Sequence, residues 1–266
     1  MYDFHVHSDF SIDCKYSMED MVLRAIEKNM KCICFTDHIE LEATERNLDI
    51  VFHAVDYFKK SKQVKYKYFR NIEILTGVEI GMQPHLNKRY DAFINENPFD
   101  YVLMSIHSVE NKDIYVDNYL ENKDPLDGVL KYYEEMLNSV NVFENYDILG
   151  HIDLIDRYFD DSALIPRLEE YEELIEKIFE KVIFSGKGIE LNTSGIRYGL
   201  PYYHPKIELL KIYKKLGGEI ITIGSDAHRP EDVGYNYKEA EKLLRELGFK
   251  YIFIYKERKK FPIHIA

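Results

Sequence analysis

This 266-residue sequence is poor in cysteine and contains no long apolar segment. Its cysteines, Cys14, Cys32 and Cys34, are poorly placed to bridge one another. We expect them to be small buried side chains in a reducing compartment instead of a metal or redox site. No apolar run approaches the roughly 20 residues that cross a bilayer, and Met1 leads into a strand-like run instead of a basic and then apolar leader. These absences predict a soluble, cytoplasmic protein with no membrane partner.

Positively charged residues are fewer than negatively charged ones. The 35 Lys and Arg residues stand against 47 Asp and Glu residues, for a net charge of −12, and such a field repels phosphate backbones. We therefore expect a small-molecule partner and no nucleic acid, whereas the oligomeric state is left open. The composition, with 45% hydrophobic and 31% charged residues, is that of an ordinary globular protein. Because no Gly-, Ser- or Pro-rich linker divides the chain, residues 1–266 are expected to form one domain, about the size of a (β/α) barrel.

Seven buried strands are expected where apolar and β-branched residues cluster. They are residues 2–7, 31–36, 73–80, 101–106, 147–151, 188–192 and 219–224. Helical patterns separate these runs, and strands that alternate with helices predict βαβ units and a parallel sheet. An eighth apolar run, 251–255, either completes the barrel or flanks it.

The helical patterns have recognisable starts and apolar faces. Ser17-x-x-Asp20 forms a capping box before one helix, and residues 166–185 carry the clearest apolar stripe. Pro205 is expected at the start of a further helix, since proline is favoured in the first helical turn. Residues 124–140 are predicted to form a helical insert that decorates the barrel.

Histidines and carboxylates recur at the ends of the apolar runs. They lie in Asp3-Phe4-His5-Val6-His7, Thr36-Asp37-His38, Gly77-Val78-Glu79, Ser105-Ile106-His107, Gly150-His151 and Ser225-Asp226-Ala227-His228. His5 and His7 are two residues apart on one strand, so their side chains share a face and can bind one ion together. The strands of a parallel barrel all end at the same rim, which would gather these side chains at one mouth. The pattern indicates a metal-dependent hydrolase.

This ordered set resembles the polymerase and histidinol phosphatase (PHP) superfamily of metal-dependent phosphoesterases. The resemblance implies a distorted, TIM-like (β/α)7 barrel with two to three divalent ions, Zn, Fe or Mn, at the C-terminal rim of its strands. It places His5, His7, Glu79 and Asp226 around a first ion, Glu79, His107 and His151 around a second, and Asp13, His38 and His228 around a third. Asp13 stands where some members have a histidine, and as an oxygen ligand it would make the third site less suited to zinc.

Two neighbouring metal ions suit phosphate esters, because together they activate a water and clamp the phosphoryl oxygens. The expected reaction is attack of a metal-bound hydroxide, with no phosphoenzyme, since no GxSxG or catalytic-cysteine motif is present. Arg157 and Arg197 follow two of the predicted strands and resemble the phosphate-binding arginines of the histidinol-phosphatase branch. A planar guanidinium matches the geometry of a phosphate group.

The resemblance implies hydrolysis of L-histidinol phosphate, a step of histidine biosynthesis. Two alternatives stay open: a PHP phosphoesterase for another small phosphate ester, a nucleotide or phosphotyrosine, and a non-catalytic metal-binding regulatory module. The proton donor to the leaving alcohol is also open between Asp226, His228 and a metal-held water.

Some polar residues are harder to assign. Candidate carboxylates for a positively charged substrate group are Glu40, Glu42, Asp153 and Asp160. The four histidines outside the ordered motifs, namely His53, His85, His204 and His264, are expected to be structural or surface residues.

Overall fold

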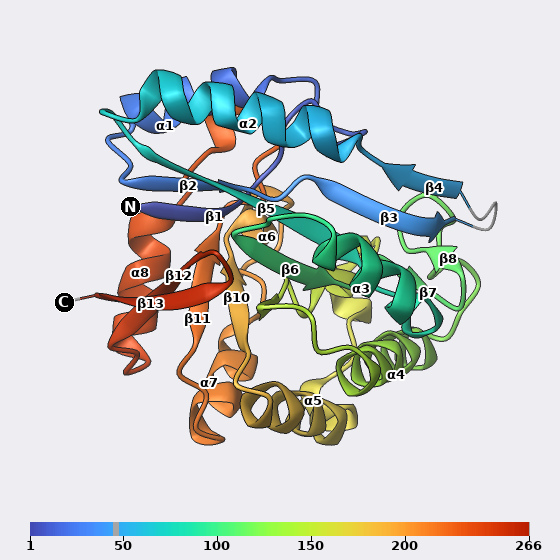
Figure 1. Cartoon of the computed structure of the whole chain (residues 1–266). Coiled ribbons are helices and arrows are strands. Elements are labelled where there is room, and N and C mark those ends of the chain that lie inside the picture. Colours follow the sequence, from blue (N-terminus) through green and yellow to red (C-terminus); the bar gives the residue numbers. More distant parts are fainter. Residues whose placement is uncertain (45–47, 266) are drawn as a thin grey trace.

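Seven parallel strands form a nearly closed barrel in the computed structural model, which describes residues 1–44 and 48–265 (Figure 1). They are β1 (Tyr2–Val6), β2 (Cys32–Phe35), β5 (Glu73–Gly81), β6 (Tyr101–Ser105), β9 (Ile148–Leu149), β10 (Gly188–Asn192) and β11 (Ile221–Gly224). Each strand pairs with the next in this order. A parallel bridge between Val6 and Ala227 joins the first strand to the segment after the last. The predicted distorted (β/α)7 barrel is confirmed.

Among the described residues, six further strands lie outside this ring. β3 (His38–Ala43) pairs parallel to β5 and antiparallel to β4 (Leu48–Val51). β7 (Ser108–Val109) and β8 (Lys112–Asp113) form a small hairpin after β6. β12 (Tyr251–Lys256) pairs only with β13 (Lys259–His264) among the described residues, so the eighth apolar run flanks the barrel and does not complete it.

Helices cover the outside of the barrel, with α1 and α2 on one side and α4, α5 and α7 on the other (Figure 1). The α-helices are α1 (Met18–Glu27), α2 (Ala54–Tyr68), α3 (Asn87–Asn95), α4 (Pro125–Val142), α5 (Glu172–Phe184), α6 (Ser194–Arg197), α7 (Ile207–Lys215) and α8 (Tyr237–Glu246). Short 3-10 turns are η1 (Pro84–Leu86), η2 (Leu154–Tyr158), η3 (Ser162–Leu164), η4 (Leu168–Glu170) and η5 (Pro230–Asp232). The capping box at Ser17 and Asp20 is present as predicted.

Three helix predictions need correction. The stripe over 166–185 is interrupted, because η4 precedes α5 and the α-helix begins only at Glu172. Pro205 lies before the helix that it was expected to begin, since α7 starts at Ile207. The insert over 124–140 is not a decoration: α4 packs against α5, and its side chains Tyr132 and Met136 are fully buried in the main core. An apolar face of this length needs a partner surface, which the barrel wall provides.

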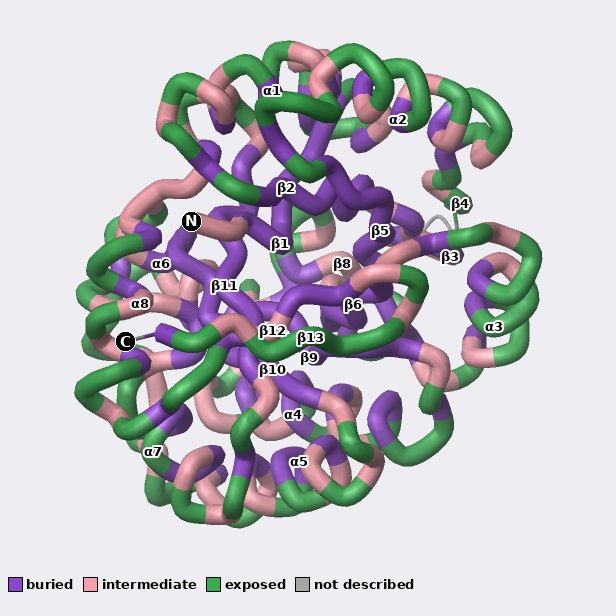
Figure 2. Tube along the Cα trace, turned by 60° about the vertical axis from the view of Figure 1, so that its left-hand side comes forward, coloured by how far each residue is buried: buried purple, intermediate pink, exposed green. Residues whose placement is uncertain are grey.

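The core consists of a large layer between strands and helices and a smaller cluster that includes the hairpin β12–β13. In Figure 2 the buried strands occupy the centre and the helices alternate between buried and exposed faces. Cys32 and Cys34 belong to the smaller cluster, where they are free and fully buried. Burial raises the pKa of both thiols well above its usual value, so they stay protonated and unreactive. No helix among the described residues combines the length and apolarity needed to cross a membrane.

The hairpin β12–β13 packs at the end of the barrel where the strands begin. Tyr255 contacts Tyr101, with ring centroids 5.4 Å apart. Arg258, at the hairpin turn, donates from Nε to Asp147 Oδ2 at 2.6 Å and from its backbone N–H to Asp100 O at 2.9 Å. Asp147 and Asp100 directly precede β9 and β6, so the hairpin lies at the end opposite to the C-terminal ends of these strands.

Replacing Arg258 by alanine is expected to lower the free energy of unfolding by about 1–3 kcal/mol, because Asp147 stays buried after losing its charged partner. Urea unfolding followed by circular dichroism measures this loss. Lys260→Ala, which removes an exposed contact to Gly186 O in the same hairpin, is the control and should change stability by less than about 0.5 kcal/mol. Equal stability of the two variants would contradict a role for the Arg258–Asp147 pair.

Candidate metal centre

Six segments bring eight of the nine predicted ligands, all but Asp13, to the C-terminal rim of the barrel. His5 and His7 come from the end of β1, and Glu79 lies near the end of β5. His38 begins β3, directly after the β2 segment. The remaining ligands follow the last residues of their strands by two to four positions: His107 after β6, His151 after β9, and Asp226 and His228 after β11. The arrangement follows from the parallel sheet, in which every strand points toward the same mouth.

Glu79 lies at the centre of this cluster and is fully buried. Five imidazoles surround its carboxylate: His5, His7, His38, His107 and His151. Its Oε2 lies 3.1 Å from His5 Nε2, 3.2 Å from His38 Nδ1 and 3.5 Å from His7 Nε2. Its Oε1 lies 2.9 Å from His151 Nε2 and 3.4 Å from His107 Nε2. Burial opposes ionisation, but the imidazoles of His5, His38 and His107 outweigh it and hold the pKa of Glu79 well below its usual value.

Asp226 supplies the second carboxylate of the cluster. Its Oδ1 lies 3.5 Å from His7 Nε2 and 3.6 Å from both His5 Nε2 and His228 Nδ1. Burial opposes ionisation here too, yet the nearby His5 imidazole keeps the pKa of Asp226 well below its usual value. The backbone of Asp226 has a φ of +54°, and its N–H donates to His5 O at 2.8 Å. This left-handed turn directs the carboxylate back over the end of β1.

The cluster has the donor set of a divalent-cation site. Ligand atoms within 4.8 Å of one another form four groups among the described residues: His5, His7 and Glu79; His5, His151 and Asp226; His38, Glu79 and His107; and His7, His38 and His228. The buried Nε2 of His7 has no hydrogen-bond partner among the described residues, and it lies 3.5 Å from both central carboxylates. A buried nitrogen without a partner is costly, and a cation beside ionised carboxylates would satisfy it, so these residues fit a divalent ion.

Asp13 lies at the edge of the cluster and is half-exposed. Its Oδ2 is 3.1 Å from His228 Nε2 and 3.7 Å from His38 Nε2. The imidazoles of both histidines lower the pKa of Asp13 although partial burial opposes this. The structure therefore brings the three residues expected around a third ion close together, and it adds His7, whose ring centroid lies 4.3 Å from that of His38 and 4.0 Å from that of His228.

The two candidate phosphate-binding arginines lie beside Asp226 and differ in their contacts. Arg157 donates from Nη2 to Ser194 Oγ at 2.6 Å and lies 3.5 Å from Asp226 Oδ2, while its buried Nε has no partner. Arg197 donates from Nη1 to Ser225 O at 2.9 Å and from Nη2 to Asp226 O at 2.7 Å. Arg197 thus holds the backbone of the turn that carries Asp226, whereas Arg157 has donor capacity left for a ligand.

Two carboxylates that touch the cluster are not among the predicted ligands: Glu190, which is fully buried, and Glu40, whose side chain is 13% exposed. Glu40, considered only as a contact for a positive substrate group, has its Oε1 2.6 Å from His107 Nδ1 and 3.3 Å from His38 Nδ1. Glu190, in the middle of β10, has its Oε1 2.8 Å from His5 Nδ1. The available signal was a carboxylate inside an otherwise apolar strand, Gly188-Ile-Glu-Leu-Asn192, which needs a buried partner.

The other candidate carboxylates have partners outside the cluster. Glu42 pairs with His85 and Arg89 on the surface, and Asp160 is exposed. Asp153 is fully buried and accepts from His204 Nδ1 at 2.6 Å. The four histidines outside the motifs do not join the metal cluster: His53, His85 and His264 are on the surface, and His204 is held by Asp153 in the interior.

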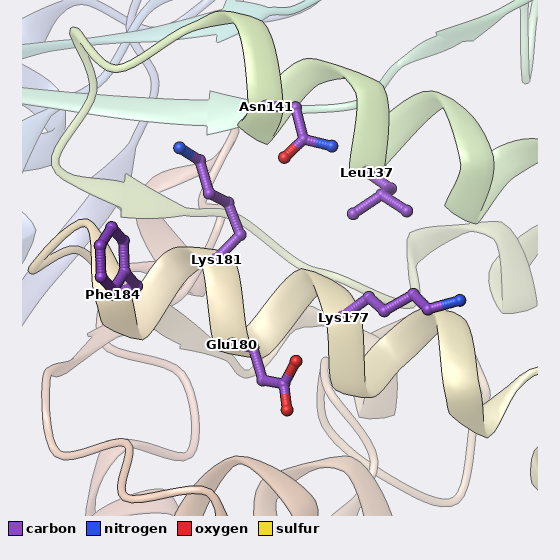
Figure 3. Close-up of a pocket in the computed structure, with 6 residues that line it drawn as sticks. All are labelled: Leu137, Asn141, Lys177, Glu180, Lys181 and Phe184. Atoms are coloured by element: carbon purple, nitrogen blue, oxygen red, sulfur yellow. The ribbon is translucent and has the colours of Figure 1, made fainter.

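A separate surface pocket lies between α4 and α5 (Figure 3). Its lining consists of Leu137, Asn141, Lys177, Glu180, Lys181 and Phe184. None of these is a candidate ligand, and the two lysines, which project from α5, pair with Glu173 and Glu144. The pocket lacks the converging polar groups of the rim and is not part of the candidate metal centre.

Comparison with known proteins identifies the family. Residues 3–194, from β1 to the start of α6, match the PHP domain family. The chain belongs to the PHP domain family. This confirms the resemblance inferred from the ordered motifs, and the matched PHP region contains all the candidate ligands except Asp226 and His228.

Two curated relatives that match over nearly their full length are described as histidinol-phosphatases. A probable histidinol-phosphatase of Clostridium acetobutylicum is 30% identical over 263 residues, which cover 98% of this chain and 99% of the relative. The histidinol-phosphatase of Lactococcus lactis is 29% identical over 254 residues, covering 93% and 91%. Among solved structures, the histidinol phosphate phosphatase of L. lactis, complexed with zinc, L-histidinol and phosphate, superposes with a TM-score of 0.87 at 26% identity, covering 98% of each chain.

Proposed function

We propose that this protein is a metal-dependent phosphomonoesterase that hydrolyses L-histidinol phosphate to L-histidinol and phosphate, a step of histidine biosynthesis. The observation that carries the proposal is the buried Glu79 carboxylate with five imidazoles around it at the C-terminal rim of a PHP barrel. The descriptions of the full-length relatives support the substrate, and the L. lactis phosphatase is similar over nearly the whole chain and holds zinc, L-histidinol and phosphate.

The proposal includes two to three divalent ions, Zn, Fe or Mn, since histidine and carboxylate ligands together suit all three metals. Their proposed ligands are His5, His7, Asp13, His38, Glu79, His107, His151, Asp226 and His228. The close approach of Glu79 to His5 and His38 through Oε2, and to His107 and His151 through Oε1, supports its role as a carboxylate shared between neighbouring ions.

Ions bound in this cluster would lower the pKa of a water and neutralise charge on the phosphoryl oxygens. Within the chain, Arg157 is the proposed primary phosphate contact, because its Nε has no partner and its guanidinium stacks 4.0 Å from the Tyr198 ring centroid. Arg197 binds the same group from the turn beside Asp226. The proposed proton donor to the leaving alcohol is Asp226, His228 or a metal-held water.

The proposal also covers the domain organisation, the type of partner and the location of the protein. The chain works as one barrel domain over residues 1–266, on a small molecule and not on nucleic acid, as the net charge of −12 favours. The cytoplasm is its proposed location, consistent with three free cysteines, all buried.

The substrate is tested with a panel of phosphate esters. Purified protein loaded with Zn²⁺ or Mn²⁺ should release phosphate from L-histidinol phosphate far faster than from nucleotides, sugar phosphates or a phosphotyrosine peptide. Equal and slow rates on every ester would contradict the substrate and favour a general PHP phosphoesterase. Bound metal without phosphate release from any ester would contradict catalysis altogether.

A further inference from the structure

Glu190 is a fully buried carboxylate that contacts two candidate metal ligands without belonging to any of the four ligand groups. Its Oε1 lies 2.8 Å from His5 Nδ1. Its Oε2 accepts from the backbone N–H of His151 at 3.0 Å and from Asn192 Nδ2 at 3.0 Å. One side chain on β10 therefore ties the end of β1 to the segment after β9, although these residues are far apart in the sequence.

The contact with His5 determines which ring nitrogen faces the cluster. Because Nδ1 is directed at Glu190, Nε2 points the opposite way, 3.1 Å from Glu79 Oε2 and 3.6 Å from Asp226 Oδ1. An imidazole that donates its Nδ1–H to a carboxylate carries its lone pair on Nε2, and the carboxylate makes that lone pair more basic.

We propose that Glu190 is a positioning residue that holds His5 in the Nδ1–H tautomer, with its Nε2 lone pair directed into the cluster of candidate ligands. The inference rests on the proposed metal sites but not on the proposed substrate. Glu190 acts through His5 and touches neither substrate nor ion.

The neighbouring strand leaves room for this contact. A Cβ at Gly224, the last residue of β11, would lie 2.1 Å from Glu190 Oε1 and 2.4 Å from His5 Cβ. Both distances are too short for non-bonded atoms, so any side chain at position 224 would displace Glu190, His5 or both. The glycine is required by the approach of Glu190 to His5, and Gly224→Ala perturbs the same contact without altering either residue.

Zn²⁺ affinity of the full-length protein, measured by competition with a chelator in the absence of substrate, tests the proposal. Glu190→Gln keeps the size of the side chain but removes its charge, and we expect it to weaken Zn²⁺ binding about 10–100-fold. The control is Asp147→Asn, which alters a buried carboxylate at the opposite end of the barrel and should lower stability but leave Zn²⁺ affinity unchanged. Unchanged affinity in folded Glu190→Gln would overturn the proposal.

A double-mutant cycle distinguishes positioning of His5 from a general loss of structure. In a His5→Gln background, Glu190→Gln should cause little further loss of Zn²⁺ affinity, because the imidazole through which Glu190 acts is gone. The same fold-loss in both backgrounds would overturn the proposal. Should Glu190→Gln fail to fold, Gly224→Ala replaces it in the affinity measurement alone, where it should also weaken Zn²⁺ binding because its Cβ displaces the Glu190–His5 contact. Failure of the unmodified protein to bind Zn²⁺ would overturn the metal sites themselves, while a different preferred ester would leave the role of Glu190 intact.

Discussion

Glu79→Gln is expected to remove bound metal and to lower kcat/KM for L-histidinol phosphate by about 10³-fold or more, roughly 4 kcal/mol of transition-state stabilisation. Among the described residues, the carboxylate of Glu79 is the only group of the cluster that lies within 3.5 Å of five imidazoles. Its negative charge therefore acts on five of the proposed histidine ligands at once. A neutral amide offers one acceptor and directs an N–H₂ group at ring nitrogens that must bind cations. Elemental analysis of metal content and initial-rate kinetics measure the two effects.

Glu73→Gln is a matched control on the same strand, because Glu73 begins β5 and is exposed at the opposite end. Its side chain pairs with Lys256 at 2.6 Å, and its loss should change stability by no more than about 0.5 kcal/mol. Activity and metal content should match those of the unmodified protein. A Glu79→Gln protein with full metal content and undiminished kcat/KM would remove Glu79 from the centre of the site.

Arg157→Ala is expected to lower kcat/KM by roughly 10²-fold, about 2.7 kcal/mol, chiefly through weaker phosphate binding. The expectation follows from the position of Arg157 beside Ser194 and Asp226 and from its unpartnered Nε. Metal content should be unchanged, since Arg157 is not a ligand. Steady-state kinetics and competitive inhibition by inorganic phosphate measure the loss of binding.

The two arginines should give different results when metal content is also measured. Arg197→Ala removes both donors to the carbonyls of Ser225 and Asp226, so we expect it to lower metal content as well as phosphate affinity. Arg167→Ala, at an exposed arginine that pairs only loosely with Glu170, serves as the control and should leave kinetics unaltered. If Arg157→Ala behaves like the control, Arg157 does not bind the phosphate.

Much of the barrel and the identity of the clustered residues were predictable from local pattern. Buried parallel strands consist of short apolar runs, and His5 and His7 end one of these runs two residues apart. Local pattern predicts the helix α4 but not its place in the fold. Residues 124–140 read as an insert that decorates the barrel, whereas Tyr132 and Met136 belong to the main core. Periodicity reports that a face is buried but not which surface buries it.

The contacts between the candidate ligands and the carboxylates around them were not predictable from local pattern. Glu190 and His5 are 185 residues apart, and Glu40 and His107 are 67 apart, so nothing in the local pattern of either residue indicates its partner. The same holds for the contacts of Arg197 with the backbone carbonyls of Ser225 and Asp226, which lie 28 and 29 residues away in the sequence.

The order of histidines and carboxylates along the chain was by itself enough to determine the barrel and the kind of chemistry at its rim, because residue type and strand period are local properties. Only the tertiary structure decided how these groups face one another. It determines which ring nitrogen of each histidine is directed into the cluster and which carboxylate lies at the centre. It also determines which carboxylates contact the candidate ligands without being ligands themselves. Those relations depend on distances between strands that meet only when the sheet closes, and no linear pattern encodes them.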